Sequence, residues 1–334
     1  WCRTATRILL PIKTFHSPSN DVFYREVRAV DWSQFIGPDR TLAVDAFVRN
    51  SLFDNSLFAA QLTKDAICDQ FQKNFSRRPS VDIADPHLLV NVYIKDNVTT
   101  ISLDSSGDAL NRRTYRPRSG EAPINEILAA GIIYMTKWDT REPFLDAMCG
   151  SGTFIIEAAL MARRIAPGLL RRRFGFMNWK TYEHNLMSEV RRQALESMWP
   201  ELPGLIIGSD IRPERIREAR ENAERAGVLE HIRFEQKSFE EQVPPPGPGV
   251  LVINPPYDRR MAVEDPGAFY KMIGDTLKKC YQGYKAYIFT GSSEGARHVG
   301  LRTSRRIKLF NGPIECRLLH YDIFPGTHKS GLEE

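Results

Sequence analysis

The stretch FLDAMCGSGTFIIEAAL, residues 144–160, decides the fold of this chain. Its first residues are apolar and typical of a buried strand, whereas the apolar run from Thr153 onward is typical of a helix. Gly150 and Gly152 join the two and allow backbone N–H groups to approach a ligand at the helix N-terminus. A strand, a glycine-rich turn and a helix in this order begin a parallel sheet with crossover helices.

The chain from about Asp139 onward continues this alternation of strands and helices. The strand-like GLIIGSDI precedes a helix that has Pro213 near its start and Gly227 at its end. Two final strand-like segments flank Asn311-Gly312, which is a hairpin signal. Other segments that favour strands are IRFEQKS, GVLVINPP and KAYIFTG. We therefore predict an α/β fold, in which a Rossmann-like, mostly parallel sheet ends in an antiparallel hairpin.

Residues 1–105 show a different pattern, which mixes helices and strands. Alternating apolar residues in LLVNVYIKDNVTTISLD predict two strands joined by a turn at Asp96-Asn97. The segment NSLFAAQLTKDAICDQFQKNF predicts an amphipathic helix with Asn55 or Ser56 as its N-cap. This half is therefore a smaller α+β domain. Residues 106–138 are predicted to be a linker, rich in Gly, Pro, Ser and Arg, and a helix that leads into the second half.

The composition is that of a globular protein, with 334 residues of which 42% are hydrophobic and 26% charged. This length suggests two or three domains. No apolar run approaches the ~18 residues of a membrane span, and no signal peptide opens the chain. The chain begins with Trp1, so we expect the native N-terminus to lie upstream. Five widely spaced cysteines without a zinc-binding pattern indicate reduced thiols in a cytoplasmic protein and no metal site.

Acidic residues at strand ends indicate which ligand the glycine loop binds. Asp146 opens the loop, where a carboxylate is unfavourable beside a pyrophosphate but suits a cationic amino-acid group. Ile155 replaces the third glycine of the pattern G-x-G-x-x-G, which argues against a nicotinamide dehydrogenase. S-Adenosylmethionine, which carries an ammonium and a sulfonium group, fits better. The predicted cofactor-binding residues are Asp146, Cys149, Gly150, Ser151, Gly152, Thr153, Asp210, Ile211, Ser238 and Phe239.

Three of these residues have specific predicted roles. Asp210 ends the second strand, where an acid can accept hydrogen bonds from both ribose hydroxyls. The alternative is an Asp that caps the following helix. Ser238 and Phe239 follow the third strand and could contact the edge and face of an adenine.

The quartet Asn254, Pro255, Pro256 and Tyr257 follows a buried strand and predicts the catalytic site. The Asn254 side-chain oxygen and the Pro255 carbonyl can both accept hydrogen bonds from one exocyclic amine, while Tyr257 stacks on the ring that carries it. The prolines stiffen the turn. This arrangement fits guanine N2 and adenine N6 equally well, and the alternative is a plain strand-ending turn.

Arginines gather in two places and predict contacts with nucleic-acid phosphates, although the net charge is only +5. The first cluster is interleaved with Tyr115, and the second precedes an aromatic stretch. The alternative for either cluster is a solvated surface. The predicted RNA-binding residues are Arg112, Arg113, Arg116, Arg118, Arg171, Arg172 and Arg173.

The motifs DAMCGSGT, GSDI and NPPY resemble those of class I S-adenosylmethionine-dependent methyltransferases that act on amino groups. With RRTYRPRSGEAPINEILAAGIIYMTKW ahead of them, the chain is similar to the THUMP-domain RNA methylases. The likeness is strongest to bacterial 23S ribosomal RNA guanine-N2 methyltransferases, often labelled N6-adenine-specific DNA methylases. It implies a THUMP-type RNA-binding domain in residues 1–105, with the remnant of a ferredoxin-like piece, and a methyltransferase domain in residues 139–334. It also implies that Ala122 to Glu126 closes over the cofactor.

The resemblance implies methylation of a guanine N2 amine in 23S ribosomal RNA, either naked or in a pre-ribosomal particle. We expect a cytoplasmic monomer. Methylation of adenine N6 in DNA or RNA is one alternative. A non-catalytic RNA-binding or assembly factor that retains the fold is another, and the intact motif set argues against it.

Overall fold

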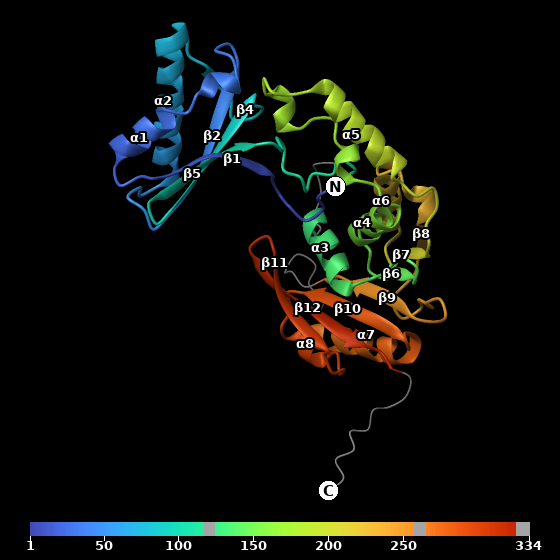
Figure 1. Ribbon diagram of the computed structural model, residues 1–334. Helices are drawn as coiled ribbons and strands as arrows, with labels where there is room; N and C mark the ends of the chain where they lie inside the picture. The colour runs from blue at the N-terminus through green and yellow to red at the C-terminus, as the bar shows by residue number, and fades with distance from the viewer. Residues whose placement is uncertain (117–123, 257–264, 325–334) are drawn as a thin grey trace. The chain divides into compact units, whose positions relative to one another are not determined.

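The computed structural model describes residues 1–116, 124–256 and 265–324. The chain forms two compact units, each with its own sheet and hydrophobic core (Figure 1). The N-terminal unit consists of Ala5–Leu110 and Arg171–Arg192. The C-terminal unit consists of Trp1–Thr4, Asn111–Leu170 and Gln193–Glu334. Within the described ranges, no helix combines the length and apolar character that a bilayer crossing requires.

Among the described residues, the sheet of the C-terminal unit has seven strands: β6 (Phe144–Asp146), β7 (Ile206–Asp210), β8 (Arg233–Gln236), β9 (Gly249–Ile253), β10 (Tyr284–Thr290), β11 (Arg305–Asn311) and β12 (Ile314–Asp322). Their order is β11-β12-β10-β9-β6-β7-β8. All neighbours from β10 to β8 are parallel, whereas β12 is antiparallel to both β10 and β11. The predicted α/β fold with a C-terminal hairpin is therefore confirmed.

Helices cover both faces of this sheet: α3 (Glu126–Thr136), α4 (Thr153–Ala162), α6 (Pro213–Arg225), α7 (Pro266–Cys280) and α8 (Gly295–His298). Successive strand residues point to opposite faces, which explains the continuous apolar runs. Val250 and Val252 of β9 join a core with α3, α4 and α6, whereas Leu251 and Ile253 join a core with α7. Helix α5 (His184–Glu196) carries residues of both units.

The strand order reverses at β6, because β7 and β8 lie on one side of it and β9 and β10 on the other. The crossover after β6 runs through α4 to β7 on one side, whereas the crossover after β9 runs through α7 to β10 on the other side. In open parallel sheets, this divergence creates a crevice at the carboxyl ends of the central strands. The crevice places the residues that follow β6, β7, β8 and β9 around one volume.

Gly274 in α7 provides a test of this packing. A Cβ at this position would lie 1.7 Å from the backbone oxygen of Val299, so the backbone would have to move. We expect Gly274→Ala to lower the free energy of unfolding by about 3 kcal/mol. Gly131 in α3 is the matched control because a Cβ there meets nothing within 4 Å. Gly131→Ala should be neutral or stabilising by up to about 1 kcal/mol, and equal urea midpoints for the two variants would contradict the packing.

The N-terminal unit is built on β1 (Leu9–His16), β2 (Thr41–Arg49), β3 (Ser80–Val81), β4 (Leu88–Lys95) and β5 (Val98–Asp104). Their order is β1-β5-β4-β2-β3, and helices α1 (Asn20–Arg28) and α2 (Ser56–Phe75) contribute to the same core as one face of the sheet. The predicted turn is confirmed, since Asp96 and Asn97 adopt φ values of 53° and 59°. Asn55 is the N-cap of α2, and its side chain accepts a hydrogen bond from the Phe58 N–H at 2.8 Å.

Candidate functional site

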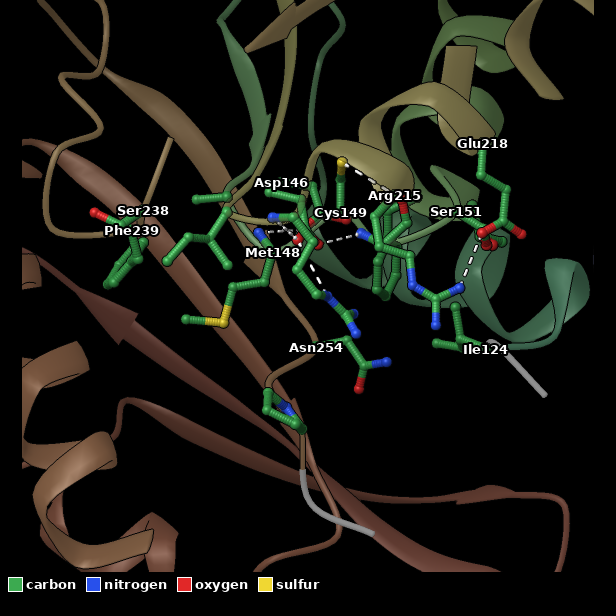
Figure 2. A pocket seen from close by; sticks show the side chains of 18 of the residues that line it. Ile124, Asp146, Met148, Cys149, Ser151, Arg215, Glu218, Ser238, Phe239 and Asn254 are labelled. Atoms are coloured by element: carbon green, nitrogen blue, oxygen red, sulfur yellow. Dashed lines mark hydrogen bonds and ion pairs between the residues drawn. The ribbon is translucent and has the colours of Figure 1, made fainter. Parts of the chain in front are cut away.

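A cavity of about 740 Å³ opens at the carboxyl ends of the central strands in the C-terminal unit (Figure 2). Four strand ends contribute to its lining: Asp146 from β6, Asp210 from β7, Ser238 beyond β8 and Asn254 beyond β9. This volume is within the range of sites for small molecules and cofactors. The fold thus brings together residues that lie far apart in the sequence.

The glycine loop between β6 and α4 forms one wall of the cavity. Gly150 and Gly152 have φ values of 52° and 86°, which favour glycine over residues with a Cβ. Gly152 also packs closely on α6, because a Cβ there would lie 3.1 Å from the Ala219 Cβ. It is the N-cap of α4 and has no side chain to cap the helix. The loop therefore leaves N–H groups at the helix start, as predicted from the sequence.

Asp146 is buried at the floor of this site, with 2% of its surface exposed. Burial raises the pKa of its carboxyl group to about 8, the nearby Asp210 carboxylate adds to this rise, and a hydrogen bond from the Met148 N–H opposes it. Among the described residues, no lysine or arginine forms an ion pair with Asp146. A buried acid without a protein cation suits a cationic ligand.

Asp210 ties the end of β7 to the glycine loop. Its Oδ2 accepts a hydrogen bond from the Gly150 N–H at 3.0 Å, and its Oδ1 accepts one from the Arg212 N–H at 3.0 Å. Helix α6 has Arg212 as its N-cap and no side-chain cap bond, so Asp210 does not cap this helix. The remaining lone pairs of the carboxylate line the cavity and can accept hydroxyl donors.

Ser238 and Phe239 lie toward one end of the cavity in Figure 2, with Ile124 and Glu218 toward the other. The Ser238 hydroxyl is 3.0 Å from Glu241 Oε2, which accepts its hydrogen bond. Phe239 is buried and one face of its ring stacks on Tyr281 at 5.5 Å. The core therefore fixes the Phe239 ring that lines this end.

Asn254 lies in the cavity wall directly after β9 (Figure 2). Its side-chain Oδ1 is buried, and no group in the described part of the chain donates a hydrogen bond to it. A buried acceptor without a donor is costly unless a ligand supplies one. Pro256 also lines the cavity, whereas Tyr257 lies outside the described residues.

The cavity lining includes residues that the motifs did not predict. Arg215 and Glu218 of α6 form an ion pair at 2.9 Å in the wall. Met148 and Met272 add apolar surface, and Ile124 comes from the stretch predicted to close over the cofactor. Helical spacing could have placed Arg215 and Glu218 on one face of α6. That this face turns toward the cavity depends on how α6 packs.

Two of the arginines that were predicted to bind RNA are buried, so the prediction for these two must be corrected. Arg113 is 1% exposed, and its guanidinium contacts Glu157 at 3.4 Å and donates to the Arg3 carbonyl. Arg171 donates hydrogen bonds to three backbone carbonyls, those of Ser106, Asp108 and Ala109. A buried guanidinium must satisfy its donors inside the protein. The prediction that these two side chains bind RNA is therefore wrong.

Arg116 also has an internal role. It is mostly buried, pairs with Glu126 at 2.7 Å and donates to the Thr153 hydroxyl at 3.2 Å. These contacts hold Arg116 beside Thr153, which lines the cavity, and its contact with RNA stays a prediction.

For three of the other arginines, RNA binding stays a prediction, and the fourth lies outside the described residues. Arg112, Arg172 and Arg173 are exposed, and Arg173 forms an ion pair with Asp85 at 3.1 Å. Exposed pairs of this kind are weak and can exchange for a phosphate. Arg118 lies outside the described residues.

Comparison with known families gives two matches. The RMKL-like methyltransferase domain matches residues 113–320, and the THUMP domain matches residues 19–104. The chain is 41% identical over 335 residues to the "Ribosomal RNA large subunit methyltransferase K/L" of Syntrophotalea carbinolica. The match covers 97% of this chain but 47% of that protein, so the chain spans about half the length of this relative.

Two further relatives match over most of their length. The chain is 36% identical to the "Putative RNA methyltransferase slr0064" of Synechocystis sp., covering 97% of this chain and 85% of that protein. The crystal structure of "SMU.472, a putative methyltransferase complexed with SAH" superposes with a TM-score of 0.86. Its sequence is 28% identical, and the superposition covers 97% of this chain and 85% of the other. The chain therefore belongs to the RMKL-like methyltransferase domain family and carries a THUMP domain ahead of that domain.

Proposed function

We propose that this protein transfers a methyl group from S-adenosylmethionine to the exocyclic N2 amine of a guanine in 23S ribosomal RNA. The observation that carries the proposal is the buried Asn254 Oδ1, which lines the cavity and accepts no hydrogen bond from the described residues. An exocyclic amine supplies the missing donor. The relatives named ribosomal RNA large subunit methyltransferase K/L support the choice of ribosomal RNA as the substrate.

The cavity fits the proposed cofactor in size and charge. Asp146 would bind its ammonium group, Asp210 its ribose hydroxyls, and Ser238 with Phe239 its adenine. The cofactor supplies a methyl group on a positively charged sulfur. The N–H groups at the start of α4 would hold its amino-acid end. The relative whose crystal structure is complexed with SAH supports the choice of cofactor.

Asn254 would act on the base. The lone pair of a ring-conjugated amine is delocalised, so this nitrogen is a poor nucleophile. A hydrogen bond from the amine to Asn254 Oδ1 holds the nitrogen toward the methyl donor and favours the positive charge that develops on it. The Pro255 carbonyl and the Tyr257 ring would complete the site, and the base must leave its stack to enter.

Mass spectrometry of digested ribosomal RNA tests the proposal. Undermethylated 23S RNA treated with the protein and S-adenosylmethionine should gain N2-methylguanosine, and the cofactor without protein should add none. Mapping the product then gives the nucleotide. Gain of N6-methyladenosine would assign the adenine alternative, and cofactor binding without any methylated product would favour the non-catalytic one. A cytoplasmic location accords with this substrate.

A further inference from the structure

One face of the N-terminal sheet presents aromatic residues outward. The core side of β2 and β4 packs with α1 and α2 through residues such as Val90 and Val92. On the opposite side, Phe47 of β2 is 53% exposed and Tyr93 of β4 is 42% exposed. Large aromatic side chains in the open on a sheet leave apolar area in water, which folding alone does not favour.

The two rings form a flat stack. Phe47 and Tyr93 are direct register partners in the parallel β2–β4 pair. Their ring centroids are 5.5 Å apart and the planes differ by 4°. Each ring uses one face against the other, and the exposed parts of the two rings can contact a further planar group. The stack thus gives some cross-strand stability and also a platform for a further ring.

Two cations stand beside this stack on the same face. Arg49 and Lys95 are the register partners two residues beyond Phe47 and Tyr93, and both are exposed. Neither forms an ion pair with another described residue, whereas many other exposed arginines and lysines of the chain do. Like charges directly opposite each other in a sheet are destabilising. A bound anion relieves this repulsion, so the pair favours an anionic ligand.

We infer that Phe47, Tyr93, Arg49 and Lys95 form a binding site for an unpaired nucleotide of the RNA substrate. The base continues the aromatic stack, and its phosphate lies between the two cations. The inference rests on the proposed function, because that function makes RNA the ligand. It adds the residues by which the N-terminal unit binds this RNA. Single-stranded RNA is the occupant because only an unstacked base exposes its face to a side chain.

Fluorescence anisotropy with the full chain tests this site. The probes are a labelled, unstructured 12-nucleotide RNA and a blunt duplex of the same length. Phe47→Ala and Tyr93→Ala should each weaken binding of the single strand by roughly tenfold and leave duplex binding nearly unchanged. Phe47→Tyr and Tyr93→Phe should restore it. Phe310→Ala is the matched control, because Phe310 is 55% exposed beside Lys308 but lies on β11.

The salt dependence of the affinity tests the contribution of the two cations. Arg49→Gln and Lys95→Gln should each lower the slope of log affinity against log salt concentration by about 0.7 for the single strand.

The flat shape of the rings is tested by Phe47→Leu and Tyr93→Leu, which keep apolar surface without a ring. Both variants should lose affinity for the single strand, while the thermal midpoint stays close to that of the parent protein.

Single-strand affinity that is equal in the parent protein and the alanine variants would overturn the inference. Absence of single-strand binding by the parent protein would also overturn it. Failure of the proposed function looks different: no methylated product would form on any RNA, while the alanine variants would still lose affinity for the single strand.

Discussion

Asn254→Ala is expected to reduce the rate of methyl transfer by about 10³-fold while the affinity for S-adenosylmethionine stays within about threefold. The substitution removes a buried acceptor that receives no hydrogen bond from the described residues and that would bind the amine. Losing one such preorganised contact costs about 10²–10³ in rate. The side chain lies beyond β9, apart from the glycine loop and Asp210 that would bind the cofactor. Single-turnover kinetics and calorimetry with S-adenosylhomocysteine measure the two effects separately.

Asn254→Asp is the matched control for this experiment. It preserves an acceptor oxygen of similar size at the same place, so it should retain more activity than the alanine variant. Turnover of Asn254→Ala equal to that of the parent protein would remove Asn254 from the mechanism. A large loss of cofactor affinity in the same variant would assign the residue to cofactor binding instead.

Asp146→Asn is expected to weaken cofactor binding by roughly 30- to 100-fold, since it would remove the proposed charge-assisted hydrogen bond to the ammonium group. The ligand requires the carboxylate, but the pKa of Asp146 in the free protein is about 8 because the group is buried. Binding near pH 6.5 must therefore release about one proton. The affinity of the parent protein should rise between pH 5.5 and 7.5, whereas that of Asp146→Asn should stay flat.

Calorimetry in buffers of different ionisation enthalpy measures this proton. The parent protein should release it on binding S-adenosylhomocysteine, and Asp146→Asn should not. Asn can still accept the Met148 N–H bond, so the variant isolates the charge. Equal proton release by both proteins would show that another group titrates.

The same pKa has a consequence for stability. Because burial raises the pKa of Asp146 above its ordinary value, the folded free protein holds this proton more tightly than the unfolded chain. The contribution of Asp146 to stability is present at pH 4 and is lost as the pH rises toward 8. Asp146→Asn should therefore raise the thermal midpoint of the ligand-free protein by a few degrees at pH 7.5 and change it little at pH 4.5.

Local sequence patterns predicted most of the C-terminal fold. The helix-to-strand alternation, the turn at Asn311-Gly312 and the residues at the strand ends depend on near neighbours in the chain. The glycine loop, Asp146, Asp210 and Asn254 were predicted from residue types in motifs that follow strands, and the carboxyl ends of parallel strands meet at one edge. The structure brings these residues to one cavity.

The tertiary structure alone decided which charged and aromatic side chains face water. Arg113 contacts Glu157, 44 residues away, and Arg171 binds carbonyls more than 60 residues earlier in the chain. Phe47 and Tyr93 meet only because β2 pairs with β4. The sequence by itself thus determined the elements and the chemistry at their ends, since these follow from local periodicity and turn geometry. Only the tertiary structure decided which arginines are buried and which aromatic rings stack on an exposed face, because both depend on partners that are distant in the chain.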